Sequence, residues 1–201
     1  MRLTTGIEIL DRRLAGGIPA GHLVVLTSQP ETQNELLFRE LSEHRETLYI
    51  STIVPQAEIE ELLDSATTTI EYAEPESLLK NPDRYLDQVT SESNVIIDPV
   101  NALESADRAE YLTFMNKLKE KLRETGSIGL VYCMEEQENP RQRSLTLKRS
   151  DVIWQLYLLV MPLTVETRLV ISKFRGGSAL REPVRLLLTD RVSIDTSQNI
   201  A

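Results

Sequence analysis

The segment TSQPETQNELL, residues 27–37, lies where a phosphate-binding loop would be expected. It follows an apolar, β-branched run, HLVVL, and leads into a short helical pattern with Leu37 and Leu41 four residues apart. In nucleotide-binding proteins, such a junction holds a glycine-rich loop that ends in Lys-Ser or Lys-Thr. Here the segment has no glycine and no lysine, and it carries Glu31 and Glu35. The surroundings of a phosphate site are therefore kept while the residues of the site are replaced.

These replacements oppose the chemistry of phosphate binding. A phosphate loop needs glycines so that backbone N–H groups can approach the phosphates, and its lysine adds a positive charge. Pro30 removes one backbone donor. A glutamate roughly 4–6 Å from a polyanion, at an effective dielectric constant of ~20, costs about 3–4 kcal/mol. We therefore expect triphosphate binding in the usual mode to be very weak.

The same segment contains a sequence that could satisfy the helix end from within. TQNE, residues 32–35, fits a capping box, in which Thr32 accepts from the N–H of residue 35 and Glu35 reaches back to the N–H of Thr32. Those N–H groups are the donors that would otherwise bind phosphate. We expect the helix to cap itself; the alternative is a disordered loop without a substitute function.

The elements that would position this segment alternate between strand and helix patterns. Short apolar, β-rich runs predict strands, and amphipathic stripes predict helices, the third of which is interrupted by Pro82 and the last of which is ended by Gly126. The predicted strands are 22–28, 47–52, 68–73, 94–98 and 127–133, and the predicted helices are 34–44, 55–65, 75–91 and 107–125.

The last third of the chain follows a different pattern. Four strand-like runs, at 150–160, 166–174, 183–189 and 192–195, follow one another with no helical pattern between them. Alternating strands and helices imply a parallel sheet, and successive strands imply an antiparallel one. The sequence therefore predicts an α/β fold whose mainly parallel sheet is flanked by helices and extended by antiparallel C-terminal strands. We expect one domain, 1–196, and a loose tail, 197–201.

Composition limits the classes of function. The net charge is −9, from 31 acidic and 22 basic residues, and the basic residues are 16 Arg and 6 Lys. An acidic, lysine-poor surface suits a salt-rich cytosol and argues against a generic nucleic-acid binder. No apolar run approaches a membrane span and the first residues lack a signal-peptide pattern, so we expect a cytoplasmic protein. Cys133 predicts a buried thiol, and His22 and His44 fit no metal-binding pattern.

Motifs at both ends of the chain resemble the KaiC and RadA branch of the RecA-like ATPases. TGIEILDRRLAGGIPAG resembles the entry to the phosphate-loop strand of that branch, NVIIDPVNALE resembles its second acidic strand (Walker B), and RLVISKFRGG resembles its terminal hairpin. The C-terminal segment also resembles KaiC-related proteins of haloarchaea, which agrees with the acidic composition. The matching entry residues are Thr5, Gly6, Leu10, Asp11, Gly16, Gly17, Ile18, Pro19 and Gly21.

The resemblance assigns family roles to positions at which this chain differs. The residues at the phosphate-loop positions are Ser28, Gln33, Asn34 and Glu35, so all four loop residues are lost. Enzymes of the KaiC type also carry a Glu-Glu pair that polarises the attacking water, whereas this chain has Thr52 and Ile53 near those positions. We therefore expect a degenerate ATPase with no catalytic residue, no bound metal and no cofactor. ATP and magnesium enter only under an alternative interpretation, an altered mode of nucleotide binding.

Other residues have functional interpretations beside simpler structural ones. Asp98 takes the magnesium position of the resemblance, although without a phosphate loop we expect it to accept hydrogen bonds at the end of its strand. Lys173 and Arg175 match a segment that in the KaiC branch reaches across a ring interface; the alternative is two solvated basic residues. Residues 140–149 could form a loop that contacts nucleic acid, but they contain no aromatic residue for base stacking, so we expect a solvated loop. Its basic residues are Arg141, Arg143, Lys148 and Arg149.

Three functional hypotheses remain at this stage. The first is a non-catalytic RecA/KaiC-like domain with a regulatory or scaffolding role, acting through protein partners as a homo-oligomer or with active KaiC or RadA relatives. The second is a weak ATP-binding or ATP-sensing regulator. The third is a DNA-associated accessory protein related to recombinase paralogues. Nucleotide titration separates the first two, and a salt-dependent gel shift tests the third.

Overall fold

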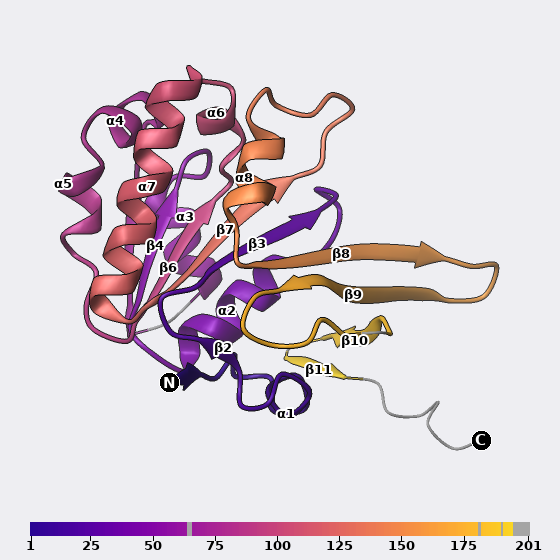
Figure 1. The fold of residues 1–201 in the computed structure, drawn as a ribbon. Helices are drawn as coiled ribbons and strands as arrows, with labels where there is room; N and C mark the ends of the chain where they lie inside the picture. The colour runs from indigo at the N-terminus through magenta and orange to yellow at the C-terminus, as the bar shows by residue number, and fades with distance from the viewer. Residues whose placement is uncertain (64–65, 181, 190, 195–201) are drawn as a thin grey trace.

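The protein was analysed as a computed structural model, which describes residues 1–63, 66–180, 182–189 and 191–194. Within these ranges, nine strands form one sheet in the order β11-β10-β9-β8-β3-β7-β6-β4-β5 (Figure 1). Its strands are β3 (Leu23–Ser28), β4 (Thr47–Ser51), β5 (Thr68–Tyr72), β6 (Asn94–Asp98), β7 (Ile128–Met134), β8 (Val152–Val160), β9 (Val165–Phe174), β10 (Val184–Leu188) and β11 (Val192–Ile194). A two-stranded antiparallel sheet pairs β1 (Arg2–Leu3) with β2 (Ile18–Pro19).

The large sheet changes from parallel to antiparallel at β8. Strands β5, β4, β6, β7, β3 and β8, in sheet order, pair in parallel. Strands β8, β9, β10 and β11 pair antiparallel. The parallel strands are connected through helices, and the antiparallel strands follow one another directly, as expected from the lengths of these connections. The predicted α/β fold class, with its antiparallel C-terminal extension, is confirmed.

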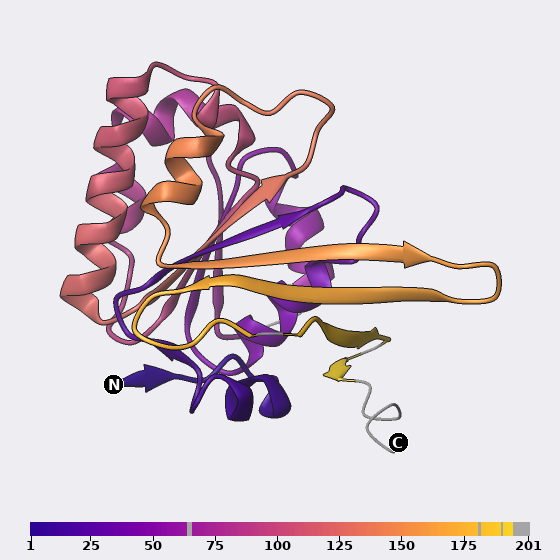
Figure 2. The ribbon, with the colours of Figure 1, turned by 45° about the vertical axis from the view of Figure 1, so that its right-hand side comes forward.

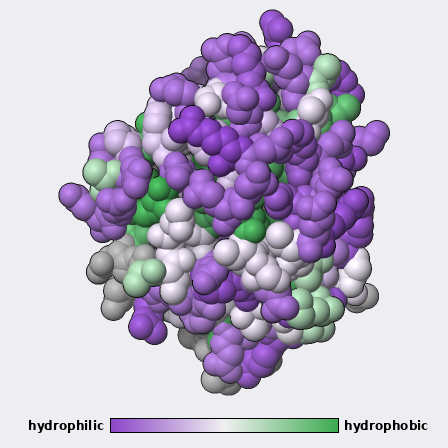
Figure 3. Space-filling view, turned by 90° about the vertical axis from the view of Figure 1, so that its left-hand side faces the viewer, coloured by the Kyte–Doolittle hydropathy of each residue, from purple (hydrophilic) through white to green (hydrophobic). Residues whose placement is uncertain are grey.

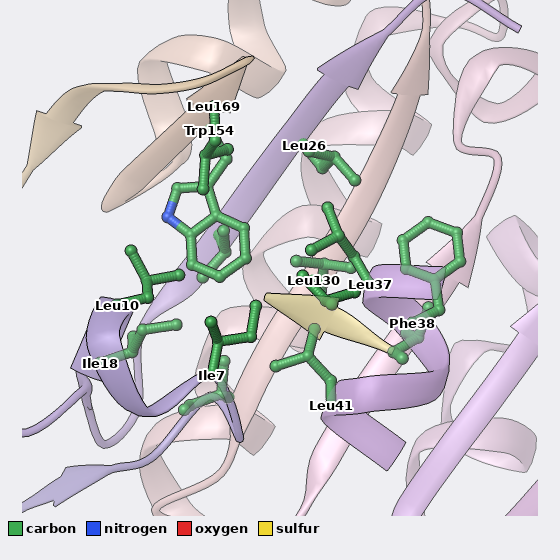
Figure 4. Close-up of a cluster of buried hydrophobic side chains, with 14 of the residues drawn as sticks. Ile7, Leu10, Ile18, Leu26, Leu37, Phe38, Leu41, Leu130, Trp154 and Leu169 are labelled. Atoms are coloured by element: carbon green, nitrogen blue, oxygen red, sulfur yellow. The ribbon is translucent and has the colours of Figure 1, made fainter. Parts of the chain in front are cut away.

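Helices cover both faces of the parallel strands and enclose two apolar cores. The helices are α1 (Glu8–Arg13), α2 (Glu35–Glu43), α3 (Gln56–Leu63), α4 (Pro75–Lys80), α5 (Pro82–Leu86), α6 (Asn101–Glu104), α7 (Arg108–Thr125) and α8 (Arg143–Arg149). Side chains alternate along β3, so Val24 and Leu26 face α1 to α3 while Leu23 and Val25 face α4 to α8. Figure 4 shows the first core, in which the fully buried Trp154 packs near Leu10.

The longest helix, α7, has the boundaries that its sequence predicts. Asp107 caps its start by accepting from the N–H groups of Ala109 and Glu110. Gly126 follows its end at φ +68°, in the left-handed region that glycine tolerates. The interrupted helix predicted at 75–91 is found over residues 75–86, as α4 and α5; the break is at Asn81, and α5 begins at Pro82.

The hairpin of β8 and β9 extends past its neighbouring strands. β3 pairs with β8 only as far as Leu156, and β10 pairs with β9 only as far as Thr167. The two hairpin strands continue to pair with each other out to Val160 and Val165. Figures 1 and 2 show this hairpin projecting from the body of the molecule.

Several features differ from the sequence predictions. Residues 143–149, expected to be a loop, form α8, and the short elements β1, α1, β2 and α6 were not predicted. The tail expected at 197–201 lies outside the described residues.

Among the described residues, no helix is long and apolar enough to span a membrane. The face that carries α4 and α5 is mostly hydrophilic (Figure 3).

Candidate functional site

The degenerate loop lies at the carboxyl edge of the parallel strands. β3 ends at Ser28, residues 29–34 form the loop, and α2 begins at Glu35. β6 ends at Asp98 at the same edge. Open α/β sheets bind ligands at this edge, so the strand–loop–helix arrangement predicted from the sequence lies where a phosphate site would form.

Three hydroxyl groups are joined by hydrogen bonds beneath the loop. Thr32 Oγ1 lies 2.7 Å from both Ser28 Oγ and the Gln29 carbonyl oxygen, either of which can accept its proton. Ser28 Oγ donates to Tyr132 Oη at 3.2 Å, and Tyr132 Oη donates to the Ser28 carbonyl at 3.3 Å. All three side chains are buried, and burial raises the pKa of Tyr132 to about 12. Oxygen atoms of the protein therefore bond to one another directly beneath the loop.

The predicted capping box does not form. The N-cap of α2 is Asn34, which makes no side-chain cap. The Thr32 hydroxyl bonds to Ser28 and Gln29 instead of the helix N–H groups. The loop instead bonds its own backbone: the N–H groups of Thr32, Asn34 and Leu36 donate to the carbonyls of residues 29, 32 and 33 at 3.1, 2.8 and 3.3 Å. The expectation of Thr32 and Glu35 as a capping pair is wrong, because a tight turn at 29–34 provides nearer carbonyl partners.

Asp98 accepts a close hydrogen bond from Tyr49, whose ring is fully buried on β4. Burial of the largely buried Asp98 carboxyl raises its pKa to about 6; the Tyr49 hydrogen bond opposes the rise and the charge of Glu35 adds to it. Burial and the Asp98 charge likewise raise the pKa of Tyr49, with a contribution from Glu35. The charge of Glu35, at the start of α2, thus acts on the Asp98 carboxyl at the end of β6.

Aromatic rings fill the space between these polar groups and the core. Phe38 of α2 packs edge-on against Tyr49 and Tyr132, with ring centroids 6.0 and 5.9 Å apart. The sequence analysis missed both tyrosines as site residues, because each lies within a strand that reads as continuous apolar core. Their hydroxyl groups, carried by the two strands that flank β6, were the available signal.

The positions that would activate water have a structural role or face solvent. Thr52 donates from its N–H to the Asp98 carbonyl at 2.9 Å and from Oγ1 to the Pro99 carbonyl at 2.6 Å, so it ties the end of β4 to the end of β6. Ile53 is 56% exposed and carries no acid–base group.

Of the four residues at the phosphate-loop positions, Gln33 is exposed to solvent. Among the described residues, no group of three or more His, Cys, Asp and Glu side chains is placed to hold a metal ion.

Lys173 and Arg175, predicted at an interface, have partners within the chain. Lys173 Nζ donates to the carbonyls of Leu147 and Ser150, at 3.0 and 2.6 Å, and so caps the end of α8. Arg175 Nη1 lies 2.9 Å from Asp151 Oδ1 and remains 59% exposed. Both residues lie near the amino end of β8, away from the degenerate loop.

The basic segment 140–149 is divided by the fold. Arg143 is buried and pairs with the fully buried Glu104, its Nε lying 3.0 and 2.8 Å from the two carboxylate oxygens. Arg149 Nη2 donates to Asn116 Oδ1 at 2.6 Å. Arg141 and Lys148 remain exposed. Arg143 is thus a core residue and cannot contact nucleic acid in this fold.

Comparisons with known proteins identify a family and a fold. A family described as "Family of unknown function (DUF7125)" matches residues 2–201. The crystal structure of a KaiC-like protein from the hyperthermophilic archaeon Pyrococcus horikoshii OT3 is similar, with a TM-score of 0.79 and 13% identity over 97% of this chain and 99% of that one. At this identity the likeness shows the fold, which is RecA-like. A comparison with curated proteins gives no match.

Proposed function

Because the chain belongs to DUF7125, a family of unknown function, we propose its role from its own geometry: a non-catalytic RecA-like domain that acts through contacts with other proteins. In this proposal the domain binds no nucleotide at the degenerate loop and has no ATPase activity. Its role is regulatory or scaffolding, with a second copy or an active KaiC or RadA relative as the partner.

One observation supports the proposal: the loop that precedes α2 hydrogen-bonds its own backbone N–H groups, and the hydroxyl groups beside it bond to one another. The loop donors Thr32 and Asn34 bond to carbonyls of the loop itself, and the hydroxyls of Ser28 and Tyr132 bond to each other. Binding a phosphate would require breaking these bonds before any new bond could form. Each buried group left without a partner costs about 1–3 kcal/mol.

Charge adds to this barrier. The charge of Glu35 contributes to the raised pKa of Asp98, so the start of α2 and the end of β6 both carry acidic groups. A like-charge contact of this kind costs about 3–4 kcal/mol at roughly 4–6 Å and an effective dielectric constant of ~20. The loop has no lysine to offset that cost.

Isothermal titration calorimetry with ATP·Mg and with ADP tests the proposal directly. We expect no binding heat from the wild-type chain. A micromolar dissociation constant would overturn the proposal, provided that binding responds to changes at the loop. Glu35→Lys supplies that criterion, because it reverses the charge at the start of α2 and should strengthen any binding there.

Glu31→Lys is the matched control. It makes the same charge change at an exposed loop residue that takes no part in the hydroxyl network. Nucleotide binding at the loop would respond more strongly to the change at Glu35, whereas general electrostatic attraction would respond equally to both. If the two substitutions changed the nucleotide affinity equally and the wild type had a micromolar dissociation constant, the nucleotide would bind elsewhere on the chain.

A role on DNA has weaker support. Arg143 is buried in an ion pair with Glu104. Arg141 and Lys148 are the exposed basic side chains of the 140–149 segment. A gel shift with single- and double-stranded DNA at increasing salt tests this role, because phosphate contacts weaken as salt rises.

A further inference from the structure

A small cavity lies at the carboxyl edge of the sheet, on the face that carries α8. It has a volume of about 290 Å³, near the lower end of the range for small-molecule pockets. Its walls come from β3, β8, α8 and the connection from β7 to α8, which arches beyond the end of β7 in Figures 1 and 2. The lining includes Thr27, Gln155, Glu135, Glu136, Arg143 and Leu147.

This cavity is separate from the degenerate loop. Side chains alternate along β3, so Thr27 lies on the same face as Val25, whose side chain packs in the core beneath α4 to α8. Ser28, one residue further on, lies on the opposite face, where it bonds to Tyr132 beneath the loop. A ligand in the cavity would therefore leave the hydroxyl network of the loop in place.

Thr27 brings a buried hydroxyl group without a partner to this cavity. It is 7% exposed, and its neighbours in the sheet register are Cys133 of β7 and Gln155 of β8. Its Oγ1 makes no hydrogen bond with any residue that the structure describes. Buried hydroxyl groups are nearly always hydrogen-bonded, because losing their bonds to water without replacement costs free energy. A ligand group that bonds to Thr27 Oγ1 would remove that cost.

Two carboxylates make the cavity negatively charged. Glu135 and Glu136 both line it, and neither forms an ion pair within the described part of the chain. Arg143 also lines the cavity, but its charge is balanced by the buried carboxylate of Glu104. The walls therefore attract a cation.

We propose that the cavity binds a primary alkylammonium group. Such a group has three N–H donors and no acceptor, which suits the carboxylates of Glu135 and Glu136 together with the Thr27 hydroxyl. Its alkyl chain would pack against Leu147, as the stem of a lysine packs on apolar surface while its charged end stays among polar groups. This binding activity goes beyond the proposed function, which concerns protein contacts and the loss of nucleotide binding.

A divalent metal ion suits the cavity less well. Mg²⁺ and Ca²⁺ take about six or more oxygen ligands. Within the described ranges, no group of three or more His, Cys, Asp and Glu side chains is placed to hold a metal. The apolar wall at Leu147 would also have no role in binding a metal ion, whereas an alkylammonium group uses both the oxygen atoms and that wall.

Two sources carry an alkylammonium group: a free aliphatic diamine and the lysine side chain of a partner protein. Isothermal titration calorimetry at low salt distinguishes them, with cadaverine as the free diamine and N-acetyl-lysine methylamide as the lysine probe. Binding of cadaverine alone would support the proposal with a free amine as the ligand. Binding of the lysine probe as well would support it with a partner's lysine as the ligand. If neither probe bound at millimolar concentration, the inference would be overturned.

Neutralising one carboxylate tests the location of the bound amine. Glu135→Gln should weaken cadaverine binding about 10- to 100-fold, as expected for the loss of one charged hydrogen bond. Glu138→Gln is the matched control, because it removes the same charge from an exposed residue of the same segment that does not line the cavity. Its cadaverine affinity should change little. Equal losses in the two variants would indicate general attraction to an acidic surface and would overturn the inference, as would Mg²⁺ binding that is tighter than cadaverine binding and depends on Glu135.

Thr27→Val separates a binding role of the hydroxyl from a structural one. The substitution removes an unpartnered polar atom and keeps the shape of the side chain, so the free protein should be at least as stable in urea unfolding. Cadaverine affinity should nevertheless fall about 3- to 10-fold. A less stable variant with unchanged cadaverine affinity would count against the site. The nucleotide titration concerns the opposite face of β3, so amine binding can fail while the absence of nucleotide binding holds.

Discussion

Replacing Asp98 by Asn should stabilise the protein near pH 8. The Asp98 carboxyl is half-buried at the end of β6, and its pKa is raised to about 6 mainly by burial. Tyr49 donates to this carboxyl and would donate equally to the amide oxygen of Asn. The substitution therefore removes an unfavourable ionisation close to Glu35 and keeps the main hydrogen bond.

The magnitude and its pH dependence follow from the shift. A rise from 3.8 to about 6 corresponds to about 3 kcal/mol at 1.36 kcal/mol per pKa unit, and partial exposure reduces the expected gain to about 1–2 kcal/mol. Because the folded-state pKa of Asp98 lies above the unfolded value, protonation favours the fold. The stability contributed by the protonated carboxyl is complete below about pH 4 and is lost as the pH rises through about 6. The advantage of Asn should therefore shrink to under about 1 kcal/mol near pH 4.

Urea unfolding of wild type and Asp98→Asn at several pH values between 4 and 8 measures the difference, since ionisations shared by the two proteins cancel. Tyr49→Phe is the companion variant: it removes the donor to the ionised carboxyl and should destabilise the protein more at pH 8 than at pH 4. An Asn variant no more stable than wild type at pH 8, or a difference that does not change with pH, would refute the idea that Asp98 is an unfavourably ionised acid.

Three further substitutions test interactions elsewhere in the fold. Glu104→Ala leaves Arg143 buried without its carboxylate and should cost about 3–5 kcal/mol in urea unfolding, whereas an exposed ion pair would cost under about 1 kcal/mol. Gly17→Ala should cost more than about 2 kcal/mol, because Gly17 has φ +105° and an added Cβ would lie 2.1 Å from the Leu3 carbonyl oxygen; a variant with an unchanged thermal midpoint would contradict this. Lys173→Met should cost about 1 kcal/mol by removing the cap of α8 without changing oligomer mass, and a lower mass in light scattering would instead support an interface role.

The order of elements was predictable because hydrophobic periodicity is a local property. The runs that became β3, β6 and β7 are short and apolar, and the stripe of α7 ends at a glycine in the left-handed conformation. Helix α8 was missed because its seven residues carry several basic side chains and read as a solvated loop. Its first residue, Arg143, is buried only because Glu104 lies opposite it.

The loss of a phosphate loop was also readable from the sequence, but its replacement was not. Absence of glycine and lysine at residues 27–37 is a property of residue type alone. The capping box was predicted from the same residues and did not form, because the Thr32 hydroxyl finds nearer partners at Ser28 and Gln29. Tyr49 and Tyr132 come from strands that are distant in the sequence and meet near the loop only through the sheet order.

The amino-acid sequence by itself determined which segments become strands and helices, the parallel and antiparallel parts of the sheet, and the loss of the phosphate-binding residues, since these depend on local periodicity and residue type. Only the tertiary structure decided which polar groups meet: Asp98 with Tyr49, Arg143 with Glu104, and Ser28 with Tyr132. Hydrogen bonds and ion pairs form over about 3 Å, and partners separated by many residues come within that distance only when the sheet order and helix packing place them there.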